Sequence, residues 1–358
     1  MIDLLDLAAE LVDIPSESHH ETALADLFEQ RLRDASQLAV HRVGDSVVAR
    51  SELDREHRIV IAGHLDTVPA NANHRARIEG DRLYGLGACD MKGGLAAQLA
   101  TALVAESPAV DVTFVFYPCE EVADEHNGLK HLFETSPHLV EGDVALLGEP
   151  TSAGIEAGCQ GTLRVEALFK GIRAHTARPW KGRNAIHRLG GVLRTLEEYD
   201  GRRPVVDGCE YREAIQAVRV EGGVAGNVVP DEATLTINYR YAPDRTPEEA
   251  EEHVGQLLAG CDQLRVDDHA PPAMPALKHP LLETLISRND LEVRAKLGWT
   301  DVARFASRGI PASNFGAGDP SIAHTQGEFV DRGEIEPVSY THLRAHETRE
   351  DRGWGVLV

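Results

Sequence analysis

The chain has 358 residues, 42% of them hydrophobic and 26% charged, which is ordinary for a globular protein of about two domains. It carries 36 Lys and Arg against 58 Asp and Glu, so its formal net charge is −22. This charge argues against a general nucleic-acid-binding protein and against a protein that binds anionic membranes. The five cysteines are widely spread without a CxxC pair, which is typical of reduced thiols in a cytoplasmic protein.

The elements up to about residue 150 alternate between helices and apolar strands. Apolar residues at helical spacing predict helices at Ile2–Val12 and Thr22–Leu32, and this acidic start lacks the basic segment of a signal peptide. Apolar runs at Ile59–Ala62 and Val112–Phe116 predict strands, and a Gly-rich loop leads into a helix that reaches about Ala105. Another strand is expected in "DVALLGEPT". This α/β alternation predicts a parallel or mixed sheet covered on both faces. No apolar run is long enough to span a membrane.

The pattern changes near residue 160. The segment "GTLRVEALFKGIRAHTA" alternates apolar and polar positions, as a half-exposed strand does. A helix, two more alternating strands and a second helix follow, which predicts an inserted α+β (ferredoxin-like) domain. The Pro-rich "HAPPAMPALKHP" is the expected return linker. We therefore expect a catalytic domain made of residues 1–160 and 273–338, and an inserted domain at 161–272.

Five side chains that bind metals well stand at the ends of predicted strands or in loops: His64, Asp90, Glu121, Glu149 and His324. In open α/β sheets, sites lie at the carboxyl ends of the strands. Imidazole and carboxylate ligands suit Zn²⁺, with Co²⁺ or Mn²⁺ as substitutes. An acidic residue or a histidine at the end of a strand is more often a solvated loop residue than a metal ligand. Without the other candidates, Asp90 would be interpreted as the N-cap of the following helix. From spacing alone, a metal site and a set of unrelated loop residues both remain open.

Several motifs occur together in an order that resembles the M20 family of dizinc peptidases and deacylases. They are "GHLDTVP", "GLGACDMKGG", "CEEVADEHNG", "LLGEPT" and "AHTQGEF", and the resemblance extends from the N-terminal helices to about Glu336. Three further segments, "KLGWTDVARF", "NFGAGDP" and "EAGCQGTLR", are most similar to the actinobacterial-type succinyl-diaminopimelate desuccinylases of that family. The resemblance implies a mixed-sheet zinc-peptidase catalytic domain, and the inserted domain would be the lid or dimerisation domain.

The resemblance assigns the metal ligands residue by residue. His64 and Glu149 would bind one Zn²⁺ ion, Glu121 and His324 would bind the other, and Asp90 would bridge the two. A bridging carboxylate needs a tight backbone, which the Gly-rich loop before the helix permits.

The resemblance also assigns three catalytic roles. Glu120 would be the general base that takes a proton from a water held between the ions, and Asp66 would hold the ring of His64. His175 in the lid would reach the active site of a partner subunit and help to bind the oxyanion, which implies a homodimer through the lid. Without the resemblance, the sequence around His175 indicates only a surface histidine on an edge strand.

Four residues would contact the substrate, a small N-acyl amino acid. By resemblance, Asn227 and Arg240 would hold its acyl carbonyl and its carboxylate, and Thr300 and Gly316 would line the pocket. The planar fork of an arginine suits a carboxylate because it donates two parallel hydrogen bonds. Arg240 could equally be a surface charge at a strand end.

The activity that the resemblance implies is cleavage of N-succinyl-LL-2,6-diaminopimelate to succinate and LL-2,6-diaminopimelate, toward lysine and cell-wall precursors. One departure bears on the substrate: Cys159–Thr162 replaces an Arg-rich segment of the better-known desuccinylases, and Arg164 or Arg178 would have to substitute. The alternatives are a related deacylase, such as one acting on N-acetylornithine, a carboxypeptidase, or a non-catalytic metal-binding scaffold. The intact Glu120 argues against the scaffold.

The segment 339–358 departs from the family pattern. After "EIEP" a closing amphipathic helix is expected, but the chain continues "VSYTHLRAHETREDRGWGVLV". His342 and His346 are four residues apart, but Leu follows His342, so the HExxH zinc motif fails. The string resembles translated adaptor or vector sequence. We therefore expect a non-native tail. If this tail replaces a natural helix, some apolar surface of the catalytic domain loses its cover.

Overall fold

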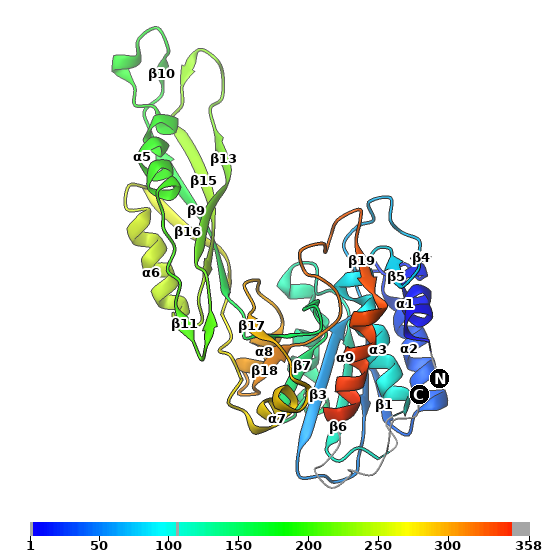
Figure 1. Ribbon diagram of the computed structural model, residues 1–358. Coiled ribbons are helices and arrows are strands. Elements are labelled where there is room, and N and C mark those ends of the chain that lie inside the picture. Colours follow the sequence, from blue (N-terminus) through cyan, green and yellow to red (C-terminus); the bar gives the residue numbers. More distant parts are fainter. Residues whose placement is uncertain (1–2, 105–106, 346–358) are drawn as a thin grey trace. The chain divides into compact units, whose positions relative to one another are not determined.

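The computed structural model describes residues 3–104 and 107–345, which form two compact units (Figure 1). The first unit comprises the described residues of 1–157, 276–294 and 304–358. The second unit comprises residues 158–275 and 295–303. The short segment 295–303, which the sequence analysis places in the catalytic domain, thus belongs to the second unit. Within the described ranges, no helix is long and apolar enough to cross a membrane.

A mixed sheet of eight strands is the centre of the first unit (Figure 1). In spatial order the strands are β1 (Ala39–Val43), β2 (Ser46–Arg50), β6 (Asp111–Tyr117), β3 (Arg58–His64), β7 (Val144–Leu147), β18 (Ala312–Asn314), β8 (Ile155–Ala157) and β17 (Val293–Ala295). The neighbours β6, β3, β7 and β18 run parallel, whereas β1, β2 and β8 pair antiparallel. The predicted mixed sheet is therefore confirmed.

The helices of the first unit cover this sheet and one another. They are α1 (Leu4–Asp13), α2 (Thr22–Ala35), α3 (Gly93–Val104), α4 (Gly128–Thr135), α7 (Pro280–Asn289) and α9 (Arg332–Ala345), with α8 (Val302–Ala306) at the boundary between the units. Helix α3 contacts β3, α1, α2 and α9. Its sequence, "GGLAAQLATALV", is small and apolar on nearly every side, as a helix enclosed by other elements requires. A small sheet of β4 (Arg77–Glu79), β5 (Arg82–Tyr84) and β19 (Phe329–Asp331) completes the unit.

Helix α9 corrects the expectation that the chain after Pro337 leaves apolar surface uncovered. The helix runs from Arg332 to Ala345 and packs on α3, so it provides the closing cover. Val338 is fully buried, and the buried His342 ring lies edge-on to Phe315 with ring centroids 5.4 Å apart. The remainder of the proposed tail, residues 346–358, lies outside the described residues.

The second unit is a four-stranded antiparallel sheet with two helices on one face (Figure 1). Its strands, in spatial order, are β13 (Ala214–Gly222), β15 (Glu232–Tyr241), β9 (Gly161–Lys170) and β16 (Gln263–Ala270), and its helices are α5 (Ala185–Glu197) and α6 (Pro247–Leu257). Alternate residues of β9, such as Val165 and Phe169, are buried in the core that both helices share. Two short antiparallel pairs belong to the same unit: β10 (Ala174–His175) pairs with β14 (Val228–Val229), and β11 (Val205–Val206) pairs with β12 (Cys209–Glu210).

Candidate metal centre

The parallel strands of the first unit bring several predicted ligands to one edge of the sheet. β3 ends at His64, β6 ends just before Glu120 and Glu121, and β7 ends just before Glu149. Because neighbouring parallel strands have their carboxyl ends at the same edge, these side chains belong to one region. Asp90 joins them from the turn that precedes α3.

The two carboxylate oxygens of Asp90 face two different histidines. Oδ1 lies 3.1 Å from Nε2 of His64, and Oδ2 lies 3.5 Å from Nε2 of His324. The same His324 nitrogen lies 2.8 Å from Oε1 of Glu121. Within the described part of the chain, His64, Asp90 and Glu121 form the group of ligand atoms that all lie within 4.8 Å of one another. Asp90 thus lies between His64 on one side and His324 on the other.

The donor set fits divalent cations. Nδ1 of the buried His64 lies 3.0 Å from the backbone oxygen of Asp66 and 3.5 Å from its carboxylate, so Nδ1 carries the proton in a neutral ring. Nε2 then presents a lone pair to an oxygen of Asp90, and two such electron donors at 3.1 Å require a proton or a cation between them. The resulting set of imidazole and carboxylate donors matches the preference of Zn²⁺ and its substitutes.

The charges within this group shift its pKa values strongly. Burial alone would lower the pKa of His64, but hydrogen bonds to Asp66 and Asp90 raise it well above the usual range. Hydrogen bonds to Asp90 and Glu121 raise the pKa of His324 to about 10. Burial acts to raise the pKa of Asp90, yet the two histidine rings hold it far below the usual value. A metal ion must therefore displace protons from both histidines, so its binding weakens as the pH falls.

Asp66 fixes the turn that carries the two adjacent acids. Its Oδ1 accepts the N–H of Glu120 at 2.9 Å, and its Oδ2 accepts the N–H of Glu121 at 3.0 Å. The hydroxyl of Ser18 also donates to Oδ2, at 2.8 Å. One buried carboxylate therefore contacts the His64 ring and holds the backbone of Glu120 and Glu121. Of these contacts, the family resemblance implies only the one with His64.

Two buried glutamates support the neighbouring backbone, and the sequence analysis missed both. Oε1 of Glu21 accepts the N–H of Cys119 at 3.0 Å, at a residue with φ of +60° just before Glu120. Oε1 of Glu328 accepts the N–H groups of Cys89 and Asp90 at 2.9 and 3.0 Å. Glu328 lies in the motif "AHTQGEF", but no spacing rule in the sequence indicates either contact.

Glu149 lies buried two residues after β7. It is not among the residues whose ligand atoms converge within 4.8 Å in the described ranges. Gly316, in the same unit, lies against this segment, because a Cβ there would approach the backbone oxygen of Gly148 to 2.2 Å. Its N–H and its carbonyl both bond to the hydroxyl of Thr151, at 3.0 Å each. Gly316 therefore serves close backbone packing beside Glu149.

The other predicted substrate and catalytic residues lie in the second unit, where they separate into two regions. His175 is exposed on β10, which pairs with β14, and the backbone oxygen of Asn227 accepts the N–H of Thr176 at 3.0 Å. Arg240 lies near the far end of β15, half-buried, with its Nε 3.1 Å from Oδ1 of Asn238. Thr300 is buried in the segment 295–303.

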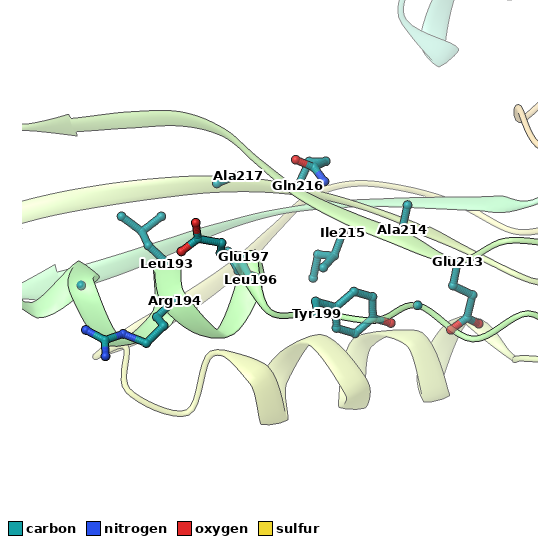
Figure 2. Close-up of a pocket in the computed structure, with 12 residues that line it drawn as sticks. Leu193, Arg194, Leu196, Glu197, Tyr199, Glu213, Ala214, Ile215, Gln216 and Ala217 are labelled. Carbon is teal, nitrogen blue, oxygen red and sulfur yellow. The ribbon is translucent and has the colours of Figure 1, made fainter.

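A pocket of about 730 Å³ lies in the second unit between α5 and β13 (Figure 2). Leu193 and Glu197 of α5 line it on one side, and Ile215 and Ala217 of β13 on the other. The predicted site residues are not among the residues that line it. The pocket follows the outer edge of the four-stranded sheet, because β13 is an edge strand.

A family model described as peptidase family M20/M25/M40 matches residues 60–348 of the chain. This range contains every predicted metal ligand. The match therefore covers both the metal centre and the inserted unit.

Two curated relatives are similar over nearly the whole chain. A Mycobacterium tuberculosis protein, provisionally named succinyl-diaminopimelate desuccinylase DapE, is 50% identical, with 93% of this chain and 95% of the relative covered. The succinyl-diaminopimelate desuccinylase of Corynebacterium glutamicum is 45% identical, with 94% of each chain covered. Among solved structures, aminopeptidase PepT from Bacillus cereus has a TM-score of 0.79 at 18% identity, with 96% of this chain and 97% of that chain covered, and so shares the fold.

Proposed function

This chain belongs to peptidase family M20/M25/M40, and from that premise we propose that it is a metal-dependent hydrolase of N-succinyl-LL-2,6-diaminopimelate. The observation that carries the proposal is the shared carboxylate of Asp90, whose two oxygens face His64 and His324. The names and the 45–50% identity of the two curated relatives support this choice of substrate.

Two divalent ions, Zn²⁺ with Co²⁺ or Mn²⁺ as substitutes, would be held by the five predicted ligands. His64 and Glu149 would hold one ion, Glu121 and His324 the other, and Asp90 both. When bound, such ions lower the pKa of a bound water toward ~7 and polarise an amide carbonyl. The supporting observation is that the histidine nitrogens of His64 and His324 lie 2.8–3.5 Å from carboxylate oxygens of Asp90 and Glu121.

Glu120 is the general base of this proposal. Its neighbour Glu121 faces His324, and Asp66 accepts the backbone N–H groups of both acids. We therefore assign metal binding to Glu121 and proton transfer to Glu120. Glu120 accepts a proton from the attacking water and returns it to the leaving amine. These two roles, metal binding and proton transfer, would account for two adjacent acids after an apolar strand.

A panel of substrates tests the choice of acyl group. We expect kcat/KM for N-succinyl-LL-2,6-diaminopimelate to exceed that for an N-acetyl amino acid such as N-acetylornithine by roughly 100-fold or more, because a site that pairs a substrate carboxylate rejects an analogue without it. Arg240 is the proposed partner of a substrate carboxylate. A dipeptide should be cleaved still more poorly. An acetyl substrate hydrolysed as well as the succinyl substrate would identify another deacylase, and a preferred dipeptide would identify a carboxypeptidase.

The separation of Asn227 from Arg240 supports a homodimer. Glu232 follows Asn227 by five positions, and Arg240 lies eight positions further along β15. A strand rises about 3.3 Å per residue, so Glu232 and Arg240 lie about 26 Å apart. A small substrate that contacts both residues needs Asn227 and Arg240 from different copies. The edge strand β13 offers the interface, since its Val218 and Val220 are 56% and 50% exposed. His175, beside Asn227, would then act at the site of the partner subunit.

A mixed dimer tests this arrangement. E120A and H175A chains, each inactive or strongly impaired alone, are co-expressed with different tags and purified through both tags. If His175 acts across the dimer, one of the two sites in the mixed dimer has an intact Glu120 and an intact His175, and we expect about half of the parent activity. A mixed dimer as impaired as the two variants would show that His175 acts within its own chain, and a monomeric parent of full activity would refute the dimer.

A further inference from the structure

The backbone at Asp90 is irregular. The turn Ala88–Lys92 follows Gly87, which has φ of +74°, and Asp90 itself has φ of −123° and ψ of 93°, outside the helical region. Irregular backbone loses the regular partners of its N–H groups, and buried N–H groups must find others. For two successive residues of this turn, Cys89 and Asp90, the partner is the carboxylate of Glu328.

Glu328 reaches this turn from a distant part of the chain. It lies 239 residues after Cys89 in the sequence, directly before β19, and its side chain is only 1% exposed. One oxygen, Oε1, accepts both N–H groups, at 2.9 and 3.0 Å. These bonds fix the Ala88–Cys89 and Cys89–Asp90 peptide planes, and the second of these planes contains the Asp90 nitrogen and Cα. They therefore constrain the position of the Cα from which the Asp90 side chain leaves the backbone.

We propose that Glu328 is a positioning residue of the metal centre: its two backbone hydrogen bonds hold Asp90 so that one carboxylate oxygen faces His64 and the other faces His324. This inference rests on the proposed metal-dependent function and adds to it a residue outside the ligand set. Glu328 acts through Asp90, because its Oε1 is already engaged by the two N–H groups.

The test compares the Zn²⁺ affinity of three variants. They distinguish the effect of losing a hydrogen-bond acceptor at the correct distance from the effect of losing the negative charge. E328A removes the acceptor. E328Q keeps an oxygen at the same reach without the charge, and E328D keeps the charge but is one methylene shorter. The metal-free protein is titrated with Zn²⁺ in competition with a chromogenic chelator, well below its unfolding temperature. We expect E328A and E328D to bind Zn²⁺ about 10- to 100-fold more weakly than the parent, with most of the affinity recovered in E328Q.

Asp111 provides the matched control. It is buried at the start of β6, at the strand end opposite to Glu120, and its carboxylate also accepts two backbone N–H groups, from Leu53 and Arg55, at 3.0 Å each. D111A should lower the melting temperature and leave Zn²⁺ affinity unchanged. The proposal is overturned if E328A binds Zn²⁺ as tightly as the parent, if D111A loses as much affinity, or if E328D recovers affinity and E328Q does not. Should E328A fail to fold, the E328Q and E328D pair decides. A parent that binds no Zn²⁺ would instead refute the proposed function.

Discussion

Replacing Glu120 by Ala is expected to lower kcat by about 10²- to 10⁴-fold, the usual contribution of a general acid–base residue, while the protein still binds its metal. The reason is the division between the two adjacent acids. Glu121 faces His324 at 2.8 Å, whereas Glu120, whose backbone N–H donates to Asp66, is proposed as the general base and not as a ligand. Removing its carboxylate therefore removes a proton acceptor without removing a ligand. Steady-state kinetics and metal analysis on the same sample measure both effects.

Glu125 is the matched control for this experiment. It belongs to the same loop, and its side chain is 78% exposed. E125A should keep the parent kcat and the parent metal content. Unchanged hydrolysis in E120A would refute the role of Glu120, and loss of metal together with activity would show that Glu120 is a ligand rather than a base.

Replacing Asp90 by Ala is expected to remove affinity for both ions and, with it, turnover. Asp90 faces His64 with one oxygen and His324 with the other, so no single-ion site remains intact without it. Residues that support a ligand without binding the metal, as proposed for Glu328, contribute at most about 100-fold to metal affinity. D90A should lose more affinity than this. Chelator competition gives the affinity, and elemental analysis gives the number of ions per chain.

The control for D90A is D81A. Asp81 is 83% exposed and pairs with Arg332 on the surface, so its loss should change neither metal content nor activity. A D90A protein that retains two ions per chain would show that Asp90 does not bridge them. Retention of one ion would assign Asp90 to a single site.

Much of the fold follows from hydrophobic pattern, because buried parallel strands are apolar along their whole length. β3, β6 and β7 were predicted on this basis, and they are buried almost throughout. The hydrophobic pattern did not predict the edge strands β1 and β16. β1 is only partly buried and reads "AVHRV", and β16 reads "QLRVDDHA" with most residues exposed, so neither has the apolar contrast that marks a strand. Helix α9 was not predicted because its apolar residues show little helical periodicity and because Pro337 lies inside it.

In the candidate site, too, features that depend on neighbouring residues in the sequence could be predicted, whereas contacts between residues far apart in the sequence could not. The sequence places His64, Glu121 and Glu149 at or just after the ends of parallel strands, and the structure brings the ligand atoms of His64, Asp90 and Glu121 within 4.8 Å of one another. The ligand set and the role of Glu120 remain predictions. The contacts of Glu328 and Glu21 could not be predicted, because their partners are the backbone N–H groups of residues 239 and 98 positions away. A contact from a side chain to a distant backbone leaves no spacing or composition signal. Only the tertiary approach of the two loops reveals it.

We propose that this fold gathers five side chains around two cations with Asp90 between them. Anomalous diffraction at the zinc absorption edge, from crystals of the Zn²⁺-loaded protein, tests it most directly. We expect two peaks, one beside His64 and Glu149 and the other beside Glu121 and His324, with Asp90 in contact with both. Peaks at other residues, or no peak at the carboxyl ends of β3 and β6, would contradict it.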